Sequence, residues 1–447
     1  HPDGPLVTSL HSRPVHPRGS TLRTPFWLAR QLVSFEAFFL LFLYGVQIRQ
    51  ILPPIPGNEA YVFGAITIVM GGWIIIRDGL YLRGVPILIT GLAFTGWMIL
   101  SIGWTPSRII VWENVRFLLT VNLWALFAGT CIIAGSRQRV IRLLVMTMLL
   151  ALGLALYGIY IEIVHGSFRF YSYKTTNEEW VTNTYIAWGY IVSTGAAMAF
   201  ALTIFSRFGS LKQLMALGVF AVCGYFLLIN GARGPLLGIA TAILLATVVQ
   251  LPHISGKRIE FAQTQLLAMA IIVLGLAYVG YLLTTGQSTY TINRFLTLFD
   301  QADDALLRTG ANRFDQFAGA YRLWLDAPAF GNGLAGFYYL YGFGREIPGN
   351  HPHNIILQIL AEFGLVGLLL FALFIASGLR NFGFGRLQSD PLALAVLMVF
   401  VTMLLYAMVA GDIARSYRFF FIVALLAMCP PAEEDDELDE EDTTAAR

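Results

Sequence analysis

The chain alternates between long apolar stretches and short polar connections, a pattern typical of membrane-spanning helices. A helix needs about 20 apolar residues to cross the hydrocarbon core of a bilayer, and most of the apolar stretches approach that length. Twelve can be delimited: Leu32–Ile48, Tyr61–Ile76, Val85–Trp104, Val115–Ile133, Val140–Val164, Tyr185–Phe205, Leu214–Asn230, Gly234–Leu251, Leu266–Leu283, Ile355–Ser377, Leu392–Gly411 and Arg418–Cys429. We therefore predict an all-α membrane protein, a polytopic bundle of about 12 transmembrane helices.

The composition agrees with this pattern and excludes an ordinary soluble domain. Apolar residues make up 57% of the chain and charged residues 13%, and the mean hydropathy is +0.67. A soluble domain carries about 25% charged residues. The net charge of +2 is too small to indicate nucleic acid as a partner. The three cysteines lie in apolar runs without paired spacing, so we predict neither a disulfide framework nor a metal site from them.

The distribution of basic residues predicts the orientation. Lys and Arg are about twice as frequent in one set of connections as in the short loops opposite, and the richer side of a membrane protein is cytoplasmic. Both termini belong to that side. We expect residues 1–31 to form a disordered cytoplasmic lead-in, residues 32–430 the transmembrane domain, and residues 431–447 a solvated acidic tail.

One outer connection, residues 284–354 between the ninth and tenth stretches, is far longer than usual. Loops of this size tend to be functional. Within it, Ala305–Leu325 repeats apolar side chains at helical spacing, which predicts an amphipathic helix along the membrane surface. The bundle should therefore carry a long, partly helical outer loop between spans 9 and 10.

The first candidate site residue is Arg233, in the string Asn-Gly-Ala-Arg-Gly-Pro that separates the seventh and eighth stretches. Pro235 suits the first position of a helix. Arg233 would then lie beside free N–H groups at a helix N-terminus, where an anion is favoured. A short charged turn is the alternative interpretation, although the flanking glycines would let a large ligand approach the backbone.

The second candidate is Arg313 on the predicted surface helix. A solvated or snorkelling side chain is the alternative interpretation. Trp324 and the string Pro-Ala-Phe-Gly-Asn-Gly at residues 328–333 follow, and the proline and glycines should end that helix.

The third candidate is His351-Pro-His-Asn, directly before the tenth stretch. Asn354 is predicted to cap the helix that starts at Ile355, which holds His353 at the membrane–water boundary. A His-x-His pair could ligate a metal, but no nearby Cys or carboxylate completes a set. A neutral imidazole that accepts a proton is the better interpretation. Glu362 lies nine residues further on, and an acid at that depth needs a partner, for which Arg or His is the candidate.

Together these residues resemble a known family. Arg313, Trp324, Pro328-Ala-Phe-Gly-Asn-Gly and the string His353-Asn-Ile-Ile-Leu-Gln-Ile-Leu-Ala-Glu-Phe-Gly-Leu-Val-Gly resemble the bacterial O-antigen ligase and polymerase superfamily. Arg233 in Ala-Arg-Gly is similar to that family's earlier outer-face arginine. The close resemblance runs from Arg233 to about Gly367, a third of the chain.

The resemblance implies a glycosyltransferase of the bacterial inner membrane with its active site on the periplasmic face. Such enzymes move a glycan from an undecaprenyl-diphosphate carrier to a saccharide acceptor, which is the lipid A core or a growing glycan. They resemble inverting enzymes that need neither a metal nor another cofactor. The implied partners are therefore these two substrates and the bilayer, with no nucleic acid.

The resemblance also implies roles for the candidate residues. Arg233 and Arg313 would hold the diphosphate and stabilise its developing charge, as guanidinium groups grip phosphate oxygens through two hydrogen bonds. His353 would act as the catalytic base that removes the acceptor proton. His351, Asn354 and Glu362 would contact substrate. Arg415 and Arg418, in the last outer connection, either add positive field around the diphosphate or anchor the chain at the interface.

Three alternatives remain open. The string at His353 and the single long outer loop favour a ligase over a repeat-unit polymerase or a protein O-oligosaccharyltransferase, which share the chemistry and differ in acceptor. A lipid-linked glycan flippase or transporter would need ionisable residues near the midplane. Only Glu36 and Glu362 lie at depth. The first outer loop, Arg49–Ala60, has no Asp, which argues against lipid-linked glycosyltransferases that use a metal.

Overall fold

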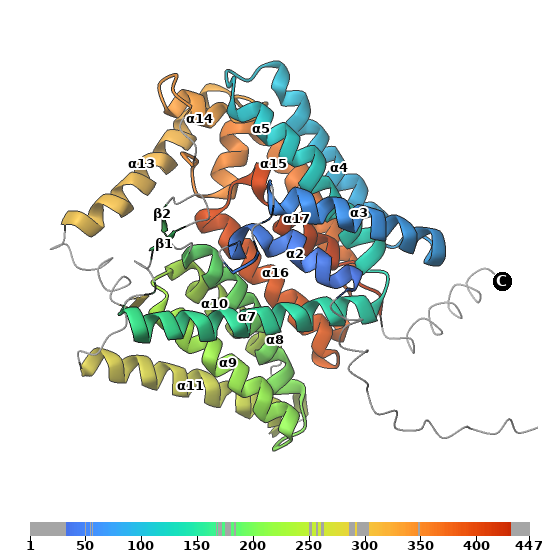
Figure 1. The fold of residues 1–447 in the computed structure, drawn as a ribbon, viewed down its shortest axis with the longest axis vertical. Coiled ribbons are helices and arrows are strands. Elements are labelled where there is room, and N and C mark those ends of the chain that lie inside the picture. The colour runs from blue at the N-terminus through green and yellow to red at the C-terminus, as the bar shows by residue number, and fades with distance from the viewer. Residues whose placement is uncertain are drawn as a thin grey trace, which may run out of the picture.

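A computed structural model describes residues 33–430, apart from residues 50, 54, 56, 167, 169–171, 175–179, 183–184, 250–252, 256–257, 261–262, 286–290, 293–303 and 347–348. The predicted lead-in, residues 1–31, and the predicted acidic tail, residues 431–447, lie outside the described residues. The described chain is almost entirely helical (Figure 1), so the all-α prediction is confirmed.

The first half of the chain contains α2 (Phe35–Ile48), α3 (Glu59–Asp78), α4 (Val85–Leu100), η1 (Ser101–Gly103), α5 (Ile110–Phe117), the π-helical turns η2 (Leu118–Asn122) and η3 (Gly129–Ile133) on either side of α6 (Leu123–Ala128), α7 (Arg137–His165), α8 (Tyr185–Phe205) and α9 (Leu211–Ile229). The second half contains α10 (Arg233–Val249), α11 (Gln263–Thr284), α13 (Asp304–Asp326), α14 (Gly336–Tyr341), α15 (Ile355–Asn381), η4 (Phe384–Gln388), α16 (Pro391–Ala410), η5 (Ile413–Arg415) and α17 (Tyr417–Leu425).

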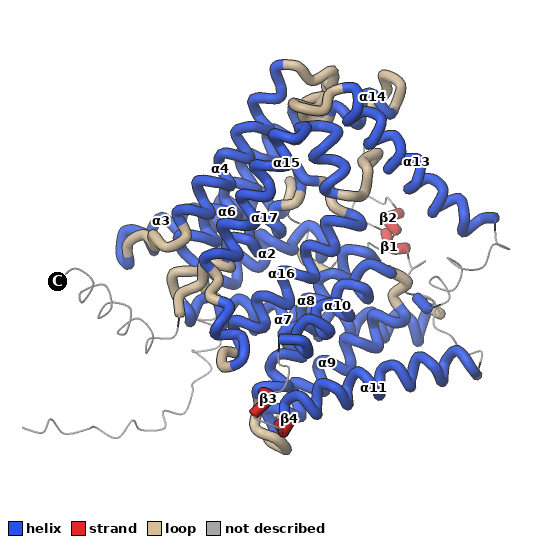
Figure 2. Tube along the Cα trace, turned by 180° about the vertical axis from the view of Figure 1, so that it is seen from behind, coloured by secondary structure: helices blue, strands red, loops and turns tan. Residues whose placement is uncertain are grey.

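Two short antiparallel hairpins interrupt the helices. Strand β1 (Ser172–Lys174) pairs with β2 (Trp180–Thr182), and β3 (His253–Ser255) pairs with β4 (Arg258–Glu260). Figure 2 shows the second hairpin beside the start of α11.

Among the described residues, 8 helical segments are long and apolar enough to cross a membrane. They are Glu59–Asp78, Val85–Gly103, Ile110–Ile133, Arg137–His165, Tyr185–Phe205, Leu211–Ile229, Ile355–Asn381 and Pro391–Ala410. Three shorter apolar helices, Phe35–Ile48, Arg233–Val249 and Met269–Leu282, coincide with the predicted first, eighth and ninth spans. The predicted twelfth span corresponds to α17, which has 9 residues and reaches about half-way across a hydrocarbon core. The count of twelve spans is therefore not confirmed.

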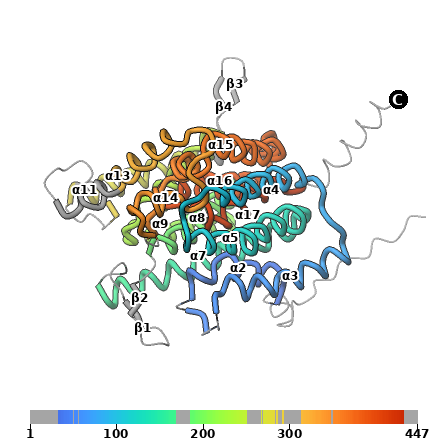
Figure 3. The backbone as a smooth tube through the Cα atoms, turned by 90° about the horizontal axis from the view of Figure 1, so that it is seen from above, coloured from blue at the N-terminus to red at the C-terminus, as the bar shows by residue number. Residues whose placement is uncertain are grey.

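Helices α8 and α16 form the centre of the bundle. In α8, 89% of an apolar stretch of 18 residues is buried. This helix packs against α7, α9, α10 and α16. Helix α16 also packs against α17, so it joins the α7–α11 group to the remaining helices, as Figure 1 shows. Seen from above in Figure 3, α2 and α3 cover one flank of this centre.

Helix α15 is broken at Gly364, and the segment that follows α13 is inserted at the break. Gly364 has φ +64° and ψ −164°, a conformation that glycine adopts without the steric cost of a Cβ. Across the break, Leu365 N donates to Pro328 O at 2.9 Å, and Gly333 N donates to Glu362 O at 2.7 Å. The string at residues 328–333 thus satisfies backbone groups that a helix end would leave without partners.

This inserted segment, residues 327–335, is also tied to the end of α4. The indole of Trp104 donates to Gly331 O at 3.1 Å, Thr105 Oγ1 donates to Leu334 O at 2.7 Å, and Leu334 N donates to Ser101 Oγ at 2.9 Å. The segment therefore fixes the start of α14 and the outer half of α15 relative to the bundle.

Candidate functional site

The start of α15 holds the histidine pair. Asn354 is the N-cap of α15, because its Oδ1 accepts from Ile356 N at 3.1 Å and Leu357 N at 3.0 Å. This confirms the predicted cap. His353, the preceding residue, has φ +54°, a left-handed conformation that is uncommon outside glycine and is concentrated at functional sites.

The rings of His351 and His353 lie close together just before α15, tilted by 50° relative to one another. Their ring centroids are 4.1 Å apart, and Tyr338 approaches His351 at 6.3 Å. Both ring nitrogens of His351 and the Nδ1 of His353 are buried without a hydrogen-bond partner among the described residues. Buried polar atoms without partners are rare in proteins, and a bound substrate is one explanation for them.

The surroundings of His353 keep it neutral. Burial, the neighbouring His351 and the charge of Arg313 lower the pKa of His353 to about 4, against an opposing effect of Asp412. A neutral imidazole can accept a proton, as general-base catalysis requires.

Arg313 acts electrostatically on His353 from a separate helix. It lies on α13, with its side chain exposed, and α13 packs against α14 and α15. Its charge acts on the imidazole of His353 and on the hydroxyl of Tyr190 in α8. Two residues that are forty positions apart in the sequence are therefore electrostatically coupled across one site.

Arg233 is the first residue of α10 and half-buried. Its position at a helix N-terminus was predicted. Pro235, however, is the third helical residue rather than the first, which is compatible with the helix because no residue of the first turn needs its N–H for an intrahelical bond.

The glycines beside Arg233 have packing roles. Gly231 turns the chain with φ +80° and donates to Thr291 Oγ1 at 2.7 Å. A Cβ on Gly234 would lie 2.1 Å from the hydroxyl of Tyr190. Tyr190 thus adjoins the Arg233 turn and lies within electrostatic range of Arg313. Its ring contacts that of Tyr406 of α16 in a tilted arrangement, with centroids 3.7 Å apart.

Asp412, which the sequence analysis did not single out, joins four elements at the site. Its carboxylate accepts from Tyr338 Oη at 2.8 Å and from Gln358 Nε2 at 3.0 Å, and it lies 4.0 Å from the guanidinium of Arg415. Burial and the charge of Asp412 raise the pKa of Tyr338 well above its usual value, so the phenol stays protonated and donates. A single acid directly after twenty apolar residues is a signal that could have found it.

Glu362 lies inside the bundle on α15. It is fully buried, and its Oε2 accepts from Ala335 N at 3.2 Å. The predicted partner was an Arg or His side chain, whereas the structure provides a backbone N–H of the inserted segment. The reason is the break at Gly364, which lets a second segment bring N–H groups to that depth.

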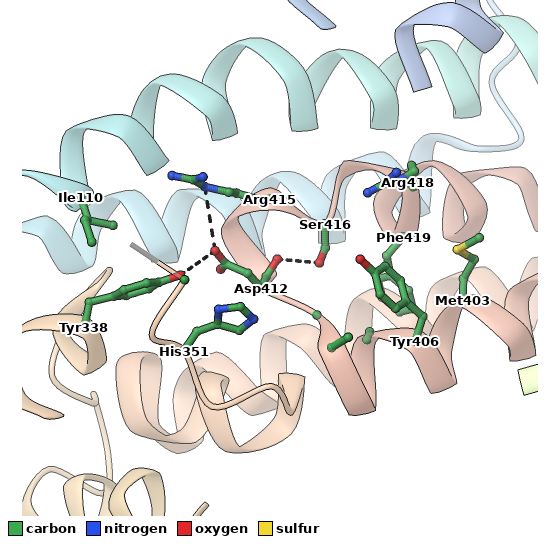
Figure 4. Close-up of a pocket in the computed structure, with 14 residues that line it drawn as sticks. Ile110, Tyr338, His351, Met403, Tyr406, Asp412, Arg415, Ser416, Arg418 and Phe419 are labelled. Atoms are coloured by element: carbon green, nitrogen blue, oxygen red, sulfur yellow. Dashed lines mark hydrogen bonds and ion pairs between the residues drawn. The ribbon is translucent and has the colours of Figure 1, made fainter. Parts of the chain in front are cut away.

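A cavity of about 230 Å³ opens beside the histidines. It lies between α14, α16 and α17 and is lined by Ile110, Tyr338, Gly349, His351, Met403, Tyr406, Ala407, Ala410, Gly411, Asp412, Arg415, Ser416, Arg418 and Phe419. Figure 4 shows Tyr338, His351, Asp412 and Arg415 at one end and Tyr406, Met403, Phe419 and Arg418 at the other. His353, Arg233 and Arg313 are not part of this lining.

The part of the chain that the structure describes contains no cluster of three or more His, Cys, Asp and Glu side chains that could hold a metal ion. The carboxylates of Asp412 and Glu362 instead accept hydrogen bonds from within the protein.

Comparison with known proteins agrees with this geometry. Residues 218–372 match the family model described as O-Antigen ligase. That segment is similar to the O-antigen ligase family. All the residues predicted for the site lie within it, from Arg233 to Glu362, whereas Asp412, Arg415 and Arg418 lie beyond it. No curated protein matches the chain.

The match confirms the family resemblance over residues 218–372. Together with the long apolar helices, it indicates a multi-pass membrane protein with a region similar to glycosyltransferases of the ligase and polymerase type.

Proposed function

We propose that this protein transfers a glycan from an undecaprenyl-diphosphate carrier to an acceptor sugar hydroxyl on the periplasmic face of the bacterial inner membrane. The observation that carries the proposal is that Arg313 and His353 come from separate elements and lie within electrostatic range of one another. A cation from α13 and a neutral imidazole at the start of α15 act on one another beside a cavity. This is the pairing that a diphosphate leaving group and a hydroxyl nucleophile require.

The reaction is an inverting displacement at the anomeric carbon. His353 removes the acceptor hydroxyl proton as that oxygen attacks, and the bond from the anomeric carbon to the diphosphate oxygen breaks. Arg313 and Arg233 stabilise the charge that develops on the diphosphate, without a metal ion. His351 and Asn354 act in substrate binding, Glu362 supports the site from inside the bundle by accepting from Ala335 N, and the bilayer holds the carrier tail.

The charges of donor and base are complementary in this arrangement. In the unliganded protein, Arg313 contributes to the low pKa of His353. A bound diphosphate offsets that positive charge, which raises the pKa of His353 toward the range where a base is most effective. Donor binding therefore prepares the base.

By resemblance, the acceptor is the lipid A core, which makes the proposed activity that of an O-antigen ligase. Reconstitution tests this directly. Purified protein in detergent receives a fluorescent undecaprenyl-diphosphate-linked glycan together with either lipid A core or a second carrier-linked repeat unit. Product on lipid A core supports the ligase, whereas elongated carrier-linked glycan supports a polymerase. A flippase gives no product, because detergent leaves no compartments to transport between.

Variants connect the reaction to the site. We expect Arg233→Ala, Arg313→Ala and His353→Ala each to lower transfer by about a hundredfold or more. Arg345→Ala, an exposed arginine on the same outer loop, serves as the control and should transfer at the wild-type rate. Wild-type turnover in Arg313→Ala or His353→Ala would refute the proposed roles.

A further inference from the structure

The two arginines that line the cavity differ in how their charges are compensated. Arg415 forms an ion pair with Glu113 at 3.0 Å and lies 4.0 Å from Asp412. Arg418 forms no ion pair with any carboxylate of the described residues. Its guanidinium lies 5.1 Å from the ring centroid of Tyr417 and is surrounded by the phenols of Tyr44, Tyr406 and Tyr417.

An uncompensated arginine in this position is costly. Arg418 is half-buried, so its guanidinium loses part of its solvation energy without gaining an opposite charge, and the neutral phenols around it do not supply a negative charge. The hydroxyl of Tyr417 is moreover engaged, because it donates to Leu43 O at 2.8 Å. Since Arg418 lines the cavity, an anion that enters the cavity can compensate it.

The start of α17 adds to the attraction for an anion. Ser416, Arg418 and Phe419 line the cavity where this helix of 9 residues begins. Phe419 N donates to Ser416 O at 2.8 Å, but the helix dipole is positive at this end. The helix end and the guanidinium thus favour the same kind of ligand.

The remaining lining indicates an amphipathic ligand. Met403, Ala407 and Phe419 give the Arg418 end apolar walls, and the opposite end carries His351 and Asp412 (Figure 4). Tyr406 lines the cavity, and its ring contacts that of Tyr190, which lies within electrostatic range of Arg313. A lipid with a charged head fits such a mixture, whereas a free sugar leaves the cation uncompensated.

We propose that Arg418, with the first turn of α17, binds a phosphate of a prenyl diphosphate lipid inside this cavity. The inference rests on the proposed function, because that lipid is the carrier part of the donor. It assigns a binding role to Arg418, which lies outside the segment similar to the O-antigen ligase family, and it gives Arg415 the separate role of holding Asp412 and Glu113.

Arginine labelling tests the assignment in the wild-type protein. Purified protein in detergent is treated with phenylglyoxal, and modification of each arginine is followed by mass spectrometry of its peptide. We expect farnesyl diphosphate to protect Arg418, while farnesol does not. Equal modification with and without farnesyl diphosphate would overturn the proposal. Protection by phosphatidylglycerol alone would overturn it as well, since the site would then belong to a bilayer lipid.

Variants test the energetic role. We expect Arg418→Gln to raise the Kd for farnesyl diphosphate by about tenfold to a hundredfold, as loss of a charge-assisted contact to phosphate does. Arg418→Lys keeps the charge and should recover part of the affinity. Arg345→Gln is the matched control, from an exposed arginine outside the cavity, and should bind as wild type. An unchanged Kd in Arg418→Gln would refute the inference.

The binding assay contains neither glycan nor acceptor, so it separates this inference from the proposed function. If wild-type protein binds farnesyl diphosphate through Arg418 but transfers no glycan, the proposed function fails and the phosphate site stands. If wild-type protein transfers glycan while Arg418→Gln keeps the wild-type KM for the donor, the proposed function stands and the site is refuted. If Arg418→Gln does not fold, the labelling experiment on the wild type decides.

Discussion

At the scale of single residues, the protonation of His353 is the property most open to measurement. Because its pKa is lowered to about 4, the imidazole is neutral throughout the physiological range and is lost as a base only in acid. We expect kcat/KM for transfer to be flat above pH 5 and to fall about tenfold per pH unit below pH 4, since this parameter reports the groups of the free enzyme.

Charged neighbours should move this titration in opposite directions. Arg313 lowers the pKa of His353 and Asp412 raises it, so Arg313→Gln should shift the titration to higher pH and Asp412→Asn to lower pH. The rate of diethylpyrocarbonate acylation at His353, followed by mass spectrometry across pH, measures this even in inactive variants. A titration in Arg313→Gln that superimposes on the wild type would contradict the coupling.

Residue types and local spacing were sufficient to predict local features of the candidate site, but not the partners of its side chains. The cap at Asn354 was predictable because it depends on neighbours two and three positions away. The partner of Glu362 was not, because Ala335 N is supplied by a segment 27 residues distant. Asp412 was missed for the same reason, since Tyr338 and Gln358 are distant in sequence.

At the scale of elements, the break in α15 is the feature that holds the site together. A Cβ on Gly364 would lie 2.3 Å from Ala329 O, in addition to the cost of a left-handed φ, which is about 1–3 kcal/mol. We therefore expect Gly364→Ala to lower the free energy of unfolding by at least about 2 kcal/mol. Scanning fluorimetry in detergent should show a lower melting temperature.

Gly218→Ala is the matched control for this substitution. Gly218 lies in α9, and an added Cβ there meets nothing within 4 Å. Alanine is favoured over glycine in a helix by about 1 kcal/mol, so the melting temperature should stay constant or rise. Equal melting temperatures for the two variants would show that the inserted segment does not stabilise the protein through the break.

The hydrophobic pattern predicted the positions of most helices, but it did not predict how short α17 is. Helix α13 (Asp304–Asp326) coincides with the predicted helix at Ala305–Leu325. Helix α17 has the composition of a span yet ends after 9 residues and is buried among its neighbours. Apolar composition predicts burial, and it does not distinguish burial in lipid from burial in protein.

At the scale of the whole molecule, the proposed chemistry needs no divalent ion, because guanidinium groups take the place of a metal. We expect transfer in the reconstituted assay to proceed at the same rate after treatment with EDTA and removal of the chelate. A metal-dependent glycosyltransferase measured in parallel should lose activity under the same treatment. Loss of transfer that Mg²⁺ or Mn²⁺ restores would contradict the mechanism.

The predicted orientation requires Phe343 and Phe208 to lie on opposite sides of the membrane. Both side chains are exposed, at 97% and 71%, in connections that the distribution of Lys and Arg assigns to the outer and inner side respectively. In a background without Cys131, Cys223 and Cys429, we expect Phe343→Cys to react with an impermeant maleimide on right-side-out bacterial membrane vesicles. Phe208→Cys should react only after permeabilisation. The reverse result would place the histidine pair on the cytoplasmic side, where a periplasmic acceptor could not reach it.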